Sequence, residues 1–295
     1  DKMKVSVLMG GASAEREVSI KTGSAVIKAC KELGYTATPI EFYDDYKSLL
    51  TEIKFSDIVF NALHGTTGED GTIQSWLEKY NISYTGSNSN ASRTCMNKDQ
   101  SKKIVRGNNF LTPDWFLIDK NIELSKIKFP CIVKPNAQGS TFGLSMVENK
   151  DTLERAISLA SEYDRNILIE NYIKGREITV GILDGEPLPI VEIVPKHQIY
   201  DYECKYSPGM SKYLCPANVD KSLTKKIKRD SVEIFEILGC SGYGRLDFIL
   251  DDSEYHFLEL NTLPGMTSTS LLPIAAKNSG RSFNQLISKI IEVSI

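Results

Sequence analysis

The chain has 295 residues, of which 41% are hydrophobic and 25% are charged, and its formal net charge is −3. This is the composition of an ordinary globular protein, which excludes a fibrous or disordered chain. The length is enough for two or three domains or for one large domain. The small negative charge gives no reason to expect a nucleic acid or a membrane surface as a partner.

The cysteines and the apolar runs indicate the compartment. None of the six cysteines belongs to a C-x-x-C pair, and there are only three histidines, which argues against a zinc–thiolate site. Several cysteines, such as Cys131, lie in apolar runs, so we expect buried, reduced thiols. No apolar run approaches the ~20 residues of a membrane helix, and the first strand follows the N-terminus without the pattern of a signal peptide. The sequence therefore predicts a cytoplasmic protein.

Strand and helix patterns alternate over roughly the first 85 residues, which predicts a parallel sheet with flanking helices. The expected strands are residues 5–9, 36–42, 58–61 and 82–84, and one expected helix covers residues 71–80. Glycine-containing turns at 10–17 and 64–71 follow two of these strands. Loops after parallel strands are where open α/β sheets place their ligands.

The rest of the chain mixes strands with helices. The pattern predicts strands at 132–135, 167–170, 177–183 and 188–194, and a helix at 153–162. Residues 195–212 are too polar and too long for a simple connection, which favours a functional loop. Leu223, Ile227, Ile234 and Leu238 recur at helical spacing, and Gly239 supplies the C-cap of that helix.

Two C-terminal segments read as the strands of one hairpin. They are residues 244–250 and 257–261. The alternation of side chains along a strand puts Arg245 and Asp247 on one face. It likewise groups Phe257 with Glu259 and Asn261.

A three-residue turn at 252–254 would place Asp247 opposite Glu259 and Arg245 opposite Asn261, with all four side chains on one face. Carboxylate and amide oxygens suit Mg²⁺, which keeps several waters and takes its other ligands from phosphates. The other interpretation is a structural ion-pair patch on a solvated sheet.

Leu258 and Leu260 alternate with these polar residues. They predict that the opposite face of the strand packs against a core, which favours a binding site over a solvated patch.

A second candidate for phosphate binding combines Lys134, at the end of a strand, with the glycine-rich residues 139–143. Backbone N–H groups and hydroxyls of such a loop can contact an anion, and the lysine adds a positive charge. An ordinary glycine-rich hairpin has the same pattern. Neither G-x-x-x-x-G-K-[ST] nor G-x-G-x-x-G after a strand occurs, so a nucleotide would be bound in another way.

Five motifs, in this order, resemble those of the D-alanine–D-alanine ligases. They are GGASAEREVS at 10–19, HGTTGEDG at 64–71, YDYECKY at 200–206, GRLD at 244–247 and ELNTLPGMT at 259–267. The resemblance runs from about Val5 to about Ile291. It implies a mixed α/β ATP-grasp fold, with an N-terminal parallel-sheet α/β domain (1–86), a central domain (87–174) and a C-terminal antiparallel-sheet domain (175–295), and ATP between the last two.

The resemblance also implies a reaction. The carboxylate of one D-alanine attacks the γ-phosphate of ATP, and the amine of a second D-alanine displaces phosphate from the resulting acyl phosphate. The product, D-alanyl-D-alanine, serves peptidoglycan synthesis. The family is commonly dimeric, so a homodimer is expected. The departures from the family pattern are modest, and one of them places Phe142 in the glycine-rich loop, where it would alter the motion of that loop.

The nucleotide side of the implied site has three sets of residues. The resemblance implies that Asp247, Glu259 and Asn261 bind two Mg²⁺ ions, which Mn²⁺ can replace. It assigns the phosphates to Lys98, Lys134 and Lys205. It assigns adenine to Glu170, Asn171, Tyr172 and Ile173, and the ribose to Glu177. As alternatives, Glu177 could be a plain surface carboxylate, and Tyr172 and Ile173 could be core residues.

The substrate side is implied in the same way. The resemblance assigns the ammonium group of the first D-alanine to Glu15, with His64 beside it, and the oxyanion of the tetrahedral intermediate to Arg245 and the Gly265 N–H. It assigns the carboxylate of the second D-alanine to Ser270 and the Leu271 N–H. It assigns closure of the loop over Glu15 to Tyr206 and Ser140. Glu15 could instead be a helix-start carboxylate, and His64 a structural histidine.

Tyr206 bears on the product. Relatives that join D-alanine to D-lactate usually lack a tyrosine at this position, so Tyr206 favours the dipeptide. The alternatives are a D-alanine–D-lactate or D-alanine–D-serine ligase of the same superfamily, or a nucleotide-binding module without catalysis.

Overall fold

The N-terminal part of the computed structural model is a three-stranded parallel sheet in the order β2-β1-β3. The structure describes residues 1–118, 123–139 and 141–295. The elements of this part are β1 (Lys4–Gly10), α1 (Arg16–Glu32), β2 (Thr36–Phe42), α2 (Tyr46–Ile53), β3 (Ile58–Asn61) and α3 (Thr72–Lys79). The parallel sheet and its first three strands confirm the sequence prediction.

The fourth strand predicted in this part does not form. Only one bridge, between Val59 and Tyr84, joins residues 82–84 to the sheet. Gly86, two residues after Tyr84, has a φ of +93°. This left-handed backbone turns the chain away before a ladder can extend.

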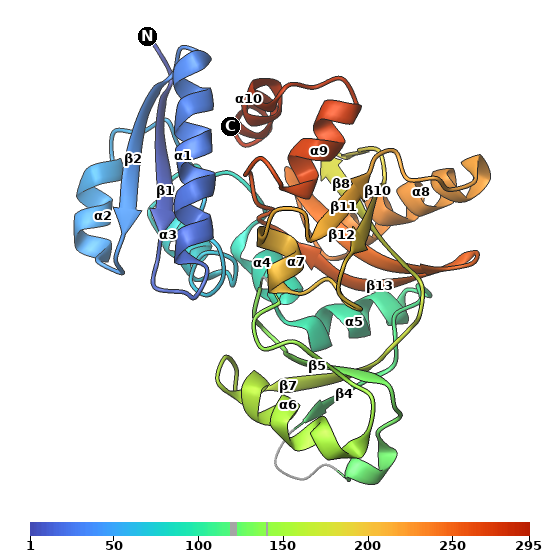
Figure 1. The fold of residues 1–295 in the computed structure, drawn as a ribbon. Coiled ribbons are helices and arrows are strands. Elements are labelled where there is room, and N and C mark those ends of the chain that lie inside the picture. Colours follow the sequence, from blue (N-terminus) through green and yellow to red (C-terminus); the bar gives the residue numbers. More distant parts are fainter. Residues whose placement is uncertain (119–122, 140) are drawn as a thin grey trace.

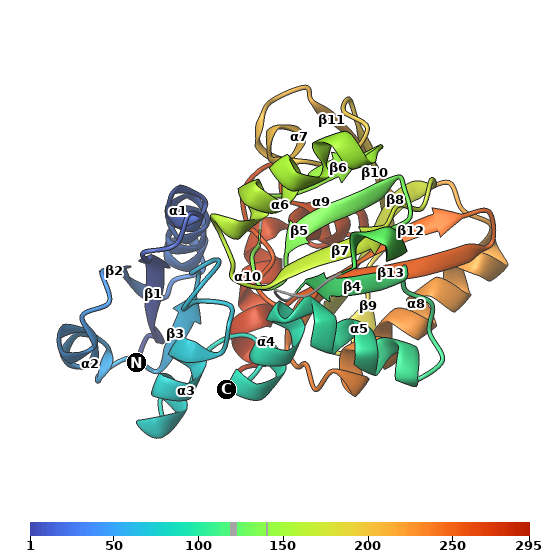
Figure 2. The ribbon, with the colours of Figure 1, turned by 90° about the horizontal axis from the view of Figure 1, so that it is seen from below.

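The central sheet is antiparallel, in the order β4-β7-β5-β6. Its elements are β4 (Trp115–Ile118), η1 (Leu124–Lys126), β5 (Cys131–Pro135), β6 (Ser145–Val147), η2 (Lys150–Thr152), α6 (Leu153–Ser161) and β7 (Ile167–Asn171). α6 packs on this sheet through Leu153, Ala156 and Ala160, which share a buried cluster with Val133 and Ile169 (Figure 2).

The C-terminal sheet is also antiparallel, with β11-β10-β8-β12-β13 in sequence and β9 beside β8. Its strands are β8 (Arg176–Leu183), β9 (Glu186–Pro187), β10 (Val191–Pro195), β11 (Ser211–Leu214), β12 (Tyr243–Asp251) and β13 (Glu254–Asn261). The helices of this region are α4 (Ser89–Met96), α5 (Lys98–Gly107), α7 (Tyr202–Tyr206), α8 (Lys221–Ile237), α9 (Leu271–Asn278) and α10 (Phe283–Glu292). Figure 1 shows α4 and α5 beside β13.

Two predictions for this region need correction. The strand predicted at 188–194 begins only at Val191, because Pro189 lacks the N–H that a ladder requires. The irregular stretch predicted at 195–212 contains α7 and the start of β11. Asp201 caps α7, since its Oδ1 accepts the Cys204 N–H at 3.0 Å.

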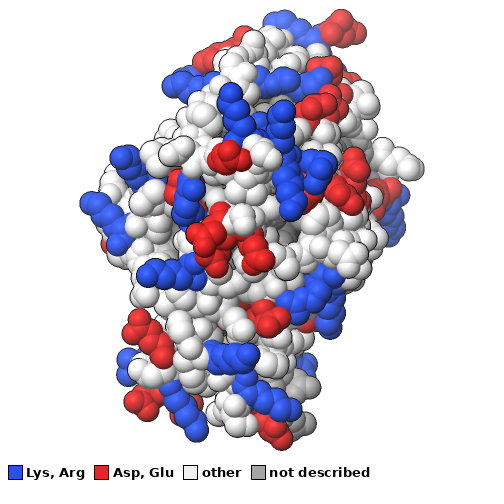
Figure 3. Space-filling model, turned by 90° about the vertical axis from the view of Figure 1, so that its right-hand side faces the viewer, with Lys and Arg blue, Asp and Glu red and all other residues white. Residues whose placement is uncertain are grey.

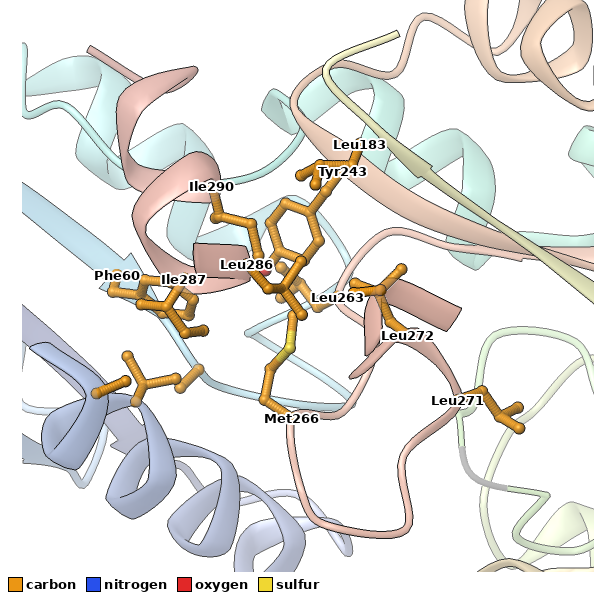
Figure 4. Packing of buried hydrophobic residues seen from close by; sticks show 14 of the residues in the cluster. Phe60, Leu183, Tyr243, Leu263, Met266, Leu271, Leu272, Leu286, Ile287 and Ile290 are labelled. Carbon is orange, nitrogen blue, oxygen red and sulfur yellow. The ribbon is translucent and has the colours of Figure 1, made fainter. Parts of the chain in front are cut away.

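One buried cluster joins the two ends of the chain. Phe60 of β3, Tyr243 of β12 and Ile287 of α10 belong to it, and Figure 4 shows Met266 among them. The N-terminal sheet is thereby packed against α10, which lies beside α1 in Figure 1. The loop that carries Met266 is held between these elements.

Charged side chains of both signs are distributed over the face seen in Figure 3. Within the described residues, no helix combines the length and the apolar character needed to cross a bilayer.

Candidate active site

Two adjoining cavities lie where the three parts of the molecule meet. The larger, of about 320 Å³, lies between the central and C-terminal sheets. The smaller, of about 70 Å³, opens toward the N-terminal part. Tyr200, Lys205 and Glu259 line both cavities, so a molecule that fills one is in contact with the walls of the other.

The structure brings the sequence-predicted site residues to these cavities. The larger is lined by Lys134, Glu170, Asn171, Tyr172, Ile173, Glu177, Lys205, Asp247 and Glu259. The smaller is lined by Glu15, His64, Lys98, Lys205, Tyr206, Arg245, Glu259, Asn261, Gly265, Ser270 and Leu271. Ser140 lies outside the described residues.

The hairpin of β12 and β13 has the predicted residue pairs, but its turn and its register differ from the prediction. Asp247 pairs with Glu259 and Arg245 with Asn261, as expected. The turn, however, has two residues instead of three, because Asp251 already pairs with Glu254. A register shift between Asp247 and Phe248 of β12 compensates for the missing turn residue.

This β-bulge exchanges the environments of two β13 residues. Phe257, predicted to share a face with Glu259, is fully buried in the core. Leu258, predicted to face the core, lines the larger cavity. A bulge allows this because its extra residue breaks the alternation of faces along the strand.

Arg245 forms a bidentate salt bridge with Asp247, with Nε–Oδ1 and Nη2–Oδ2 distances of 2.8 and 3.0 Å. Both side chains are buried, and this bidentate geometry is the strongest that a guanidinium makes with a carboxylate. Burial lowers the pKa of Arg245, but Asp247 outweighs this and raises it. The Arg245 side chain therefore stays charged at the wall of the smaller cavity.

Glu259 is surrounded by cations. Lys98 Nζ lies 3.3 Å from its Oε2. Burial favours the protonated form, but Lys98, Lys205 and Lys134 outweigh it and lower the pKa of Glu259 to about 2. The carboxylate is therefore ionised at neutral pH, as a ligand of a divalent cation must be.

Glu177 lies on β8, where it pairs with Ile249 of β12. Burial and the nearby Asp247 raise its pKa to about 8. The side chain lines the larger cavity, which argues against the plain surface carboxylate considered from the sequence.

Glu170 is held between two lysines. Its Oε1 lies 3.1 Å from Lys134 Nζ and its Oε2 lies 2.5 Å from Lys102 Nζ. All three side chains are buried. The two lysines outweigh burial and lower the pKa of Glu170.

Glu15 sits between two glycines that are far apart in the sequence. A Cβ atom on Gly65 would lie 2.8 Å from Glu15 Oε2, and one on Gly139 would lie 2.6 Å from the same atom. Only glycine leaves room for the carboxylate at both places. Glu15 is the N-cap residue of α1, but its side chain makes no cap hydrogen bond, so the helix-start explanation accounts for its position and not for its carboxylate.

His64 is buried and bonded on both ring nitrogens. Nε2 lies 3.0 Å from Thr22 Oγ1, and Nδ1 lies 3.4 Å from Glu69 Oε1. Burial lowers the pKa of His64, but the hydrogen bond and the charge of Glu69, together with the charge of Glu15 and the Leu263 backbone, outweigh it and raise the pKa. These contacts give His64 a structural role, while it also lines the smaller cavity.

The N-terminus of α9 forms part of the wall of the smaller cavity. Ser270 is its N-cap residue, and Ser270 Oγ accepts the Thr267 N–H at 2.9 Å. A Cβ on Gly265 would lie 2.9 Å from this Oγ, so a larger residue would crowd the serine. Leu271 is the first residue of the helix, where backbone N–H groups have no partner within the helix and favour an anion.

Comparison with known proteins gives the family. The family model described as D-ala D-ala ligase C-terminus matches residues 104–292, and the one described as D-ala D-ala ligase N-terminus matches residues 44–87. A D-alanine–D-alanine ligase of Aquifex aeolicus is 46% identical over 98% of this chain and 100% of its own length. The chain belongs to the D-alanine–D-alanine ligase family.

Solved structures of D-alanine–D-alanine ligases have the same mixed α/β fold. The Bacillus anthracis D-alanine–D-alanine ligase complexed with ATP matches with a TM-score of 0.87 and 38% identity, over 100% of this chain and 97% of that one. The VanG D-Ala:D-Ser ligase of Enterococcus faecalis has a TM-score of 0.84 and 28% identity, over 100% of both chains. The ATP-grasp fold predicted from the sequence is therefore confirmed.

An aromatic series connects α7 with the glycine-rich loop. The rings of Tyr202 and Tyr206 in α7 are 4.7 Å apart. Phe142 of the glycine-rich loop lies 4.9 Å from Tyr202 and 5.5 Å from Tyr163. The phenylalanine in which this chain departs from the ligase pattern thus packs the glycine-rich loop against α7.

Three residues at or near the site received no role from the sequence. Tyr200 belongs to the YDYECKY motif but was given no role, and it lines both cavities. The backbone carbonyl of Gln138 accepts a hydrogen bond from Lys98 Nζ at 2.9 Å. Lys102 lies four residues after Lys98, so both occupy one face of α5. That spacing was the signal available for Lys102.

Proposed function

We propose that this protein joins two D-alanines to D-alanyl-D-alanine, with cleavage of ATP to ADP and phosphate, for peptidoglycan precursor synthesis in the cytoplasm. The observation that carries this proposal is the pair of cavities that share Lys205 and Glu259. One cavity is large enough for a nucleotide. The wall of the other combines the Glu15 carboxylate with the N-terminus of α9 at Ser270 and Leu271, which together complement an amino acid.

The reaction has two steps. A carboxylate oxygen of the first D-alanine forms a bond to the γ-phosphorus, and the bond from that phosphorus to ADP breaks. The amine of the second D-alanine then attacks the carbonyl carbon of the acyl phosphate and loses a proton. Phosphate leaves from the tetrahedral intermediate with the electron pair of the C–O bond.

We propose that Asp247, Glu259 and Asn261 hold Mg²⁺, as two ions. Their oxygens are the hard ligands that this cation prefers, and Mn²⁺ accepts the same set. Glu259, with a pKa of about 2, fits this use. Bound metal would neutralise charge on the phosphates. Asp247 would then exchange part of its contact with Arg245 for the cation.

The cations of the site would stabilise the transferring phosphoryl group. Lys98, Lys134 and Lys205 line the two cavities, and fixed positive charge is the main requirement of phosphoryl transfer. The segment Glu170, Asn171, Tyr172 and Ile173 would hold adenine, and Glu177 would accept a hydrogen bond from the ribose.

The substrates would lie in the smaller cavity. Glu15, beside His64, would take the ammonium of the first D-alanine. Ser270 and the Leu271 N–H would take the carboxylate of the second, since a helix N-terminus favours an anion.

Arg245 and the Gly265 N–H would face the oxyanion of the tetrahedral intermediate. Tyr206, with Ser140, would close the site over Glu15, because water would hydrolyse the acyl phosphate. Tyr206 also favours D-alanine over D-lactate as the second substrate.

Two further proposals concern organisation. We retain the division into 1–86, 87–174 and 175–295, since each part contributes one sheet. We also retain a homodimer, to be tested by light scattering.

Release of ADP from reactions with D-alanine alone, with L-alanine alone, or with D-alanine together with D-serine or D-lactate tests the proposed function. We expect release with D-alanine alone and a product with the mass of the dipeptide. A depsipeptide or a mixed D-alanyl-D-serine product would establish the alternative that the VanG likeness raises. Binding of ATP without ADP release for any substrate would establish a module without catalysis.

A further inference from the structure

We propose that Lys102, which lines neither cavity, is a positioning residue that sets both walls of the nucleotide cavity. The inference rests on the proposed function, because it assigns that cavity to ATP. It differs from the lysine roles already given, since Lys102 would act through other residues and not through contact with a phosphate.

Lys102 is completely enclosed. Its side chain is 0% exposed, and its ammonium group donates to Glu170 Oε2 at 2.5 Å and to Thr112 Oγ1 at 2.8 Å. The same nitrogen lies 4.9 Å from the centre of the Trp115 ring. A carboxylate, a hydroxyl and an aromatic face therefore surround one buried cation.

The first wall is the one that carries Lys134. Glu170 binds both lysines, one on each carboxylate oxygen. One negative charge thus faces two positive charges, and the cluster has a net charge of about +1. If Lys102 were absent, Glu170 would neutralise Lys134. With Lys102 present, Lys134 keeps its attraction for a triphosphate.

The second wall is β13. Thr112 Oγ1 accepts from Lys102 and donates its own hydrogen to the backbone oxygen of Phe257 at 2.7 Å. The Phe257 N–H donates to the oxygen of Leu111 at 2.8 Å. Phe257 immediately precedes Leu258 and Glu259, which line the cavity. The chain of hydrogen bonds thus runs from Glu170 through Lys102 to the backbone beside the bulge.

A contribution to folding alone does not explain this arrangement. Replacing buried ion pairs by apolar residues of similar volume is often neutral or stabilising. Burial lowers the pKa of Lys102 to about 8 despite its contact with Glu170, so keeping the ammonium charged at this place is costly. A charge that is costly to the fold is expected where the site uses it.

Direct titration with ATP and Mg²⁺, together with steady-state kinetics, tests the proposal. Lys102→Met keeps the length of the side chain and removes the charge. We expect the Kd and KM for ATP to rise about tenfold or more, while the KM for D-alanine changes less than about twofold. Lys103→Met is the matched control, because Lys103 is the next residue on α5 and its side chain is 67% exposed. This variant should bind ATP as the wild type does.

A double variant distinguishes charge from packing. In Lys102→Met with Glu170→Gln, the carboxylate that neutralises Lys134 is also removed. We expect ATP binding to recover at least about threefold relative to Lys102→Met, because Lys134 is again uncompensated. Mere loss of packing predicts further weakening.

Thr112→Val tests the second wall and also replaces Lys102→Met if that variant does not fold. We expect Thr112→Val to need several-fold more Mg²⁺ for half-maximal rate, since β13 carries Glu259. The proposal is overturned if folded Lys102→Met binds ATP as the wild type does, or if its double variant binds no better and Thr112→Val has a normal Mg²⁺ requirement. A wild type that binds ATP but releases no ADP would instead refute the proposed function and leave these binding results interpretable.

Discussion

Asp247 of β12 and Glu259 of β13 are register partners, and the β-bulge beside them brings Leu258 into the same cavity wall. A regular ladder would have left Leu258 on the core side and Phe257 in the site. The bulge therefore determines which apolar side chain a nucleotide would meet next to the proposed metal ligands.

Leu258→Ala and Leu260→Ala test this exchange of faces. Leu258→Ala should raise the KM for ATP by roughly threefold to tenfold, through lost apolar contact, with little change in stability. Leu260 is 3% exposed and belongs to the core, so Leu260→Ala should cost about 2–5 kcal/mol of unfolding free energy. Thermal melts and ATP kinetics of both variants make the comparison, and the reversed pattern would contradict the bulge.

Glu259→Gln should reduce kcat by about 10²–10³-fold, because the proposed metal site and the surrounding lysines lose their counter-charge. Glu254→Gln, in the same strand but exposed, is the control and should be near normal. Rates measured across a Mg²⁺ series check this. A near-normal kcat for Glu259→Gln would remove Glu259 from the metal ligands.

The His64–Glu69 pair should make stability depend on pH. Since the folded-state pKa of His64 is raised, the contribution of the pair is full below the unfolded value of about 6.5 and is lost as the pH rises through the folded value. Each unit of difference contributes about 1.4 kcal/mol. Glu69→Gln should therefore lower the Tm more at pH 6 than at pH 9, with the exposed Glu32→Gln as control. Equal losses at both values would show that His64 is neutral throughout.

Tyr206→Phe should raise the KM of the second D-alanine by roughly threefold to tenfold, the effect of one lost hydrogen bond, with a smaller change for ATP. Tyr202→Phe removes a hydroxyl from the neighbouring ring of the same series and serves as the control. Kinetics with D-alanine, D-serine and D-lactate make the measurement. An unchanged KM and acceptor preference would mean that the Tyr206 hydroxyl has no part in closing the site.

Much of the site could be predicted because its parts are local. Arg245 and Asp247 are two residues apart on one strand, so the backbone geometry alone puts them on one face. Glu15, Gly65 and Gly265 lie in turns whose residue order resembles the ligase motifs. Local spacing and motif order therefore located the residues without any knowledge of how the three sheets pack.

Only the tertiary structure decided the rest. The two glycines that enclose Glu15, Gly65 and Gly139, are 74 positions apart in the printed numbering, and the pairing of Lys102 with Glu170 spans 68 positions. No periodicity links such residues, because their contact is set by how sheets and helices pack. The β-bulge is also a feature that tertiary packing decides. Alternation along a strand is a property of its own backbone, whereas an extra residue is tolerated only where the core accepts Phe257 and the cavity accepts Leu258.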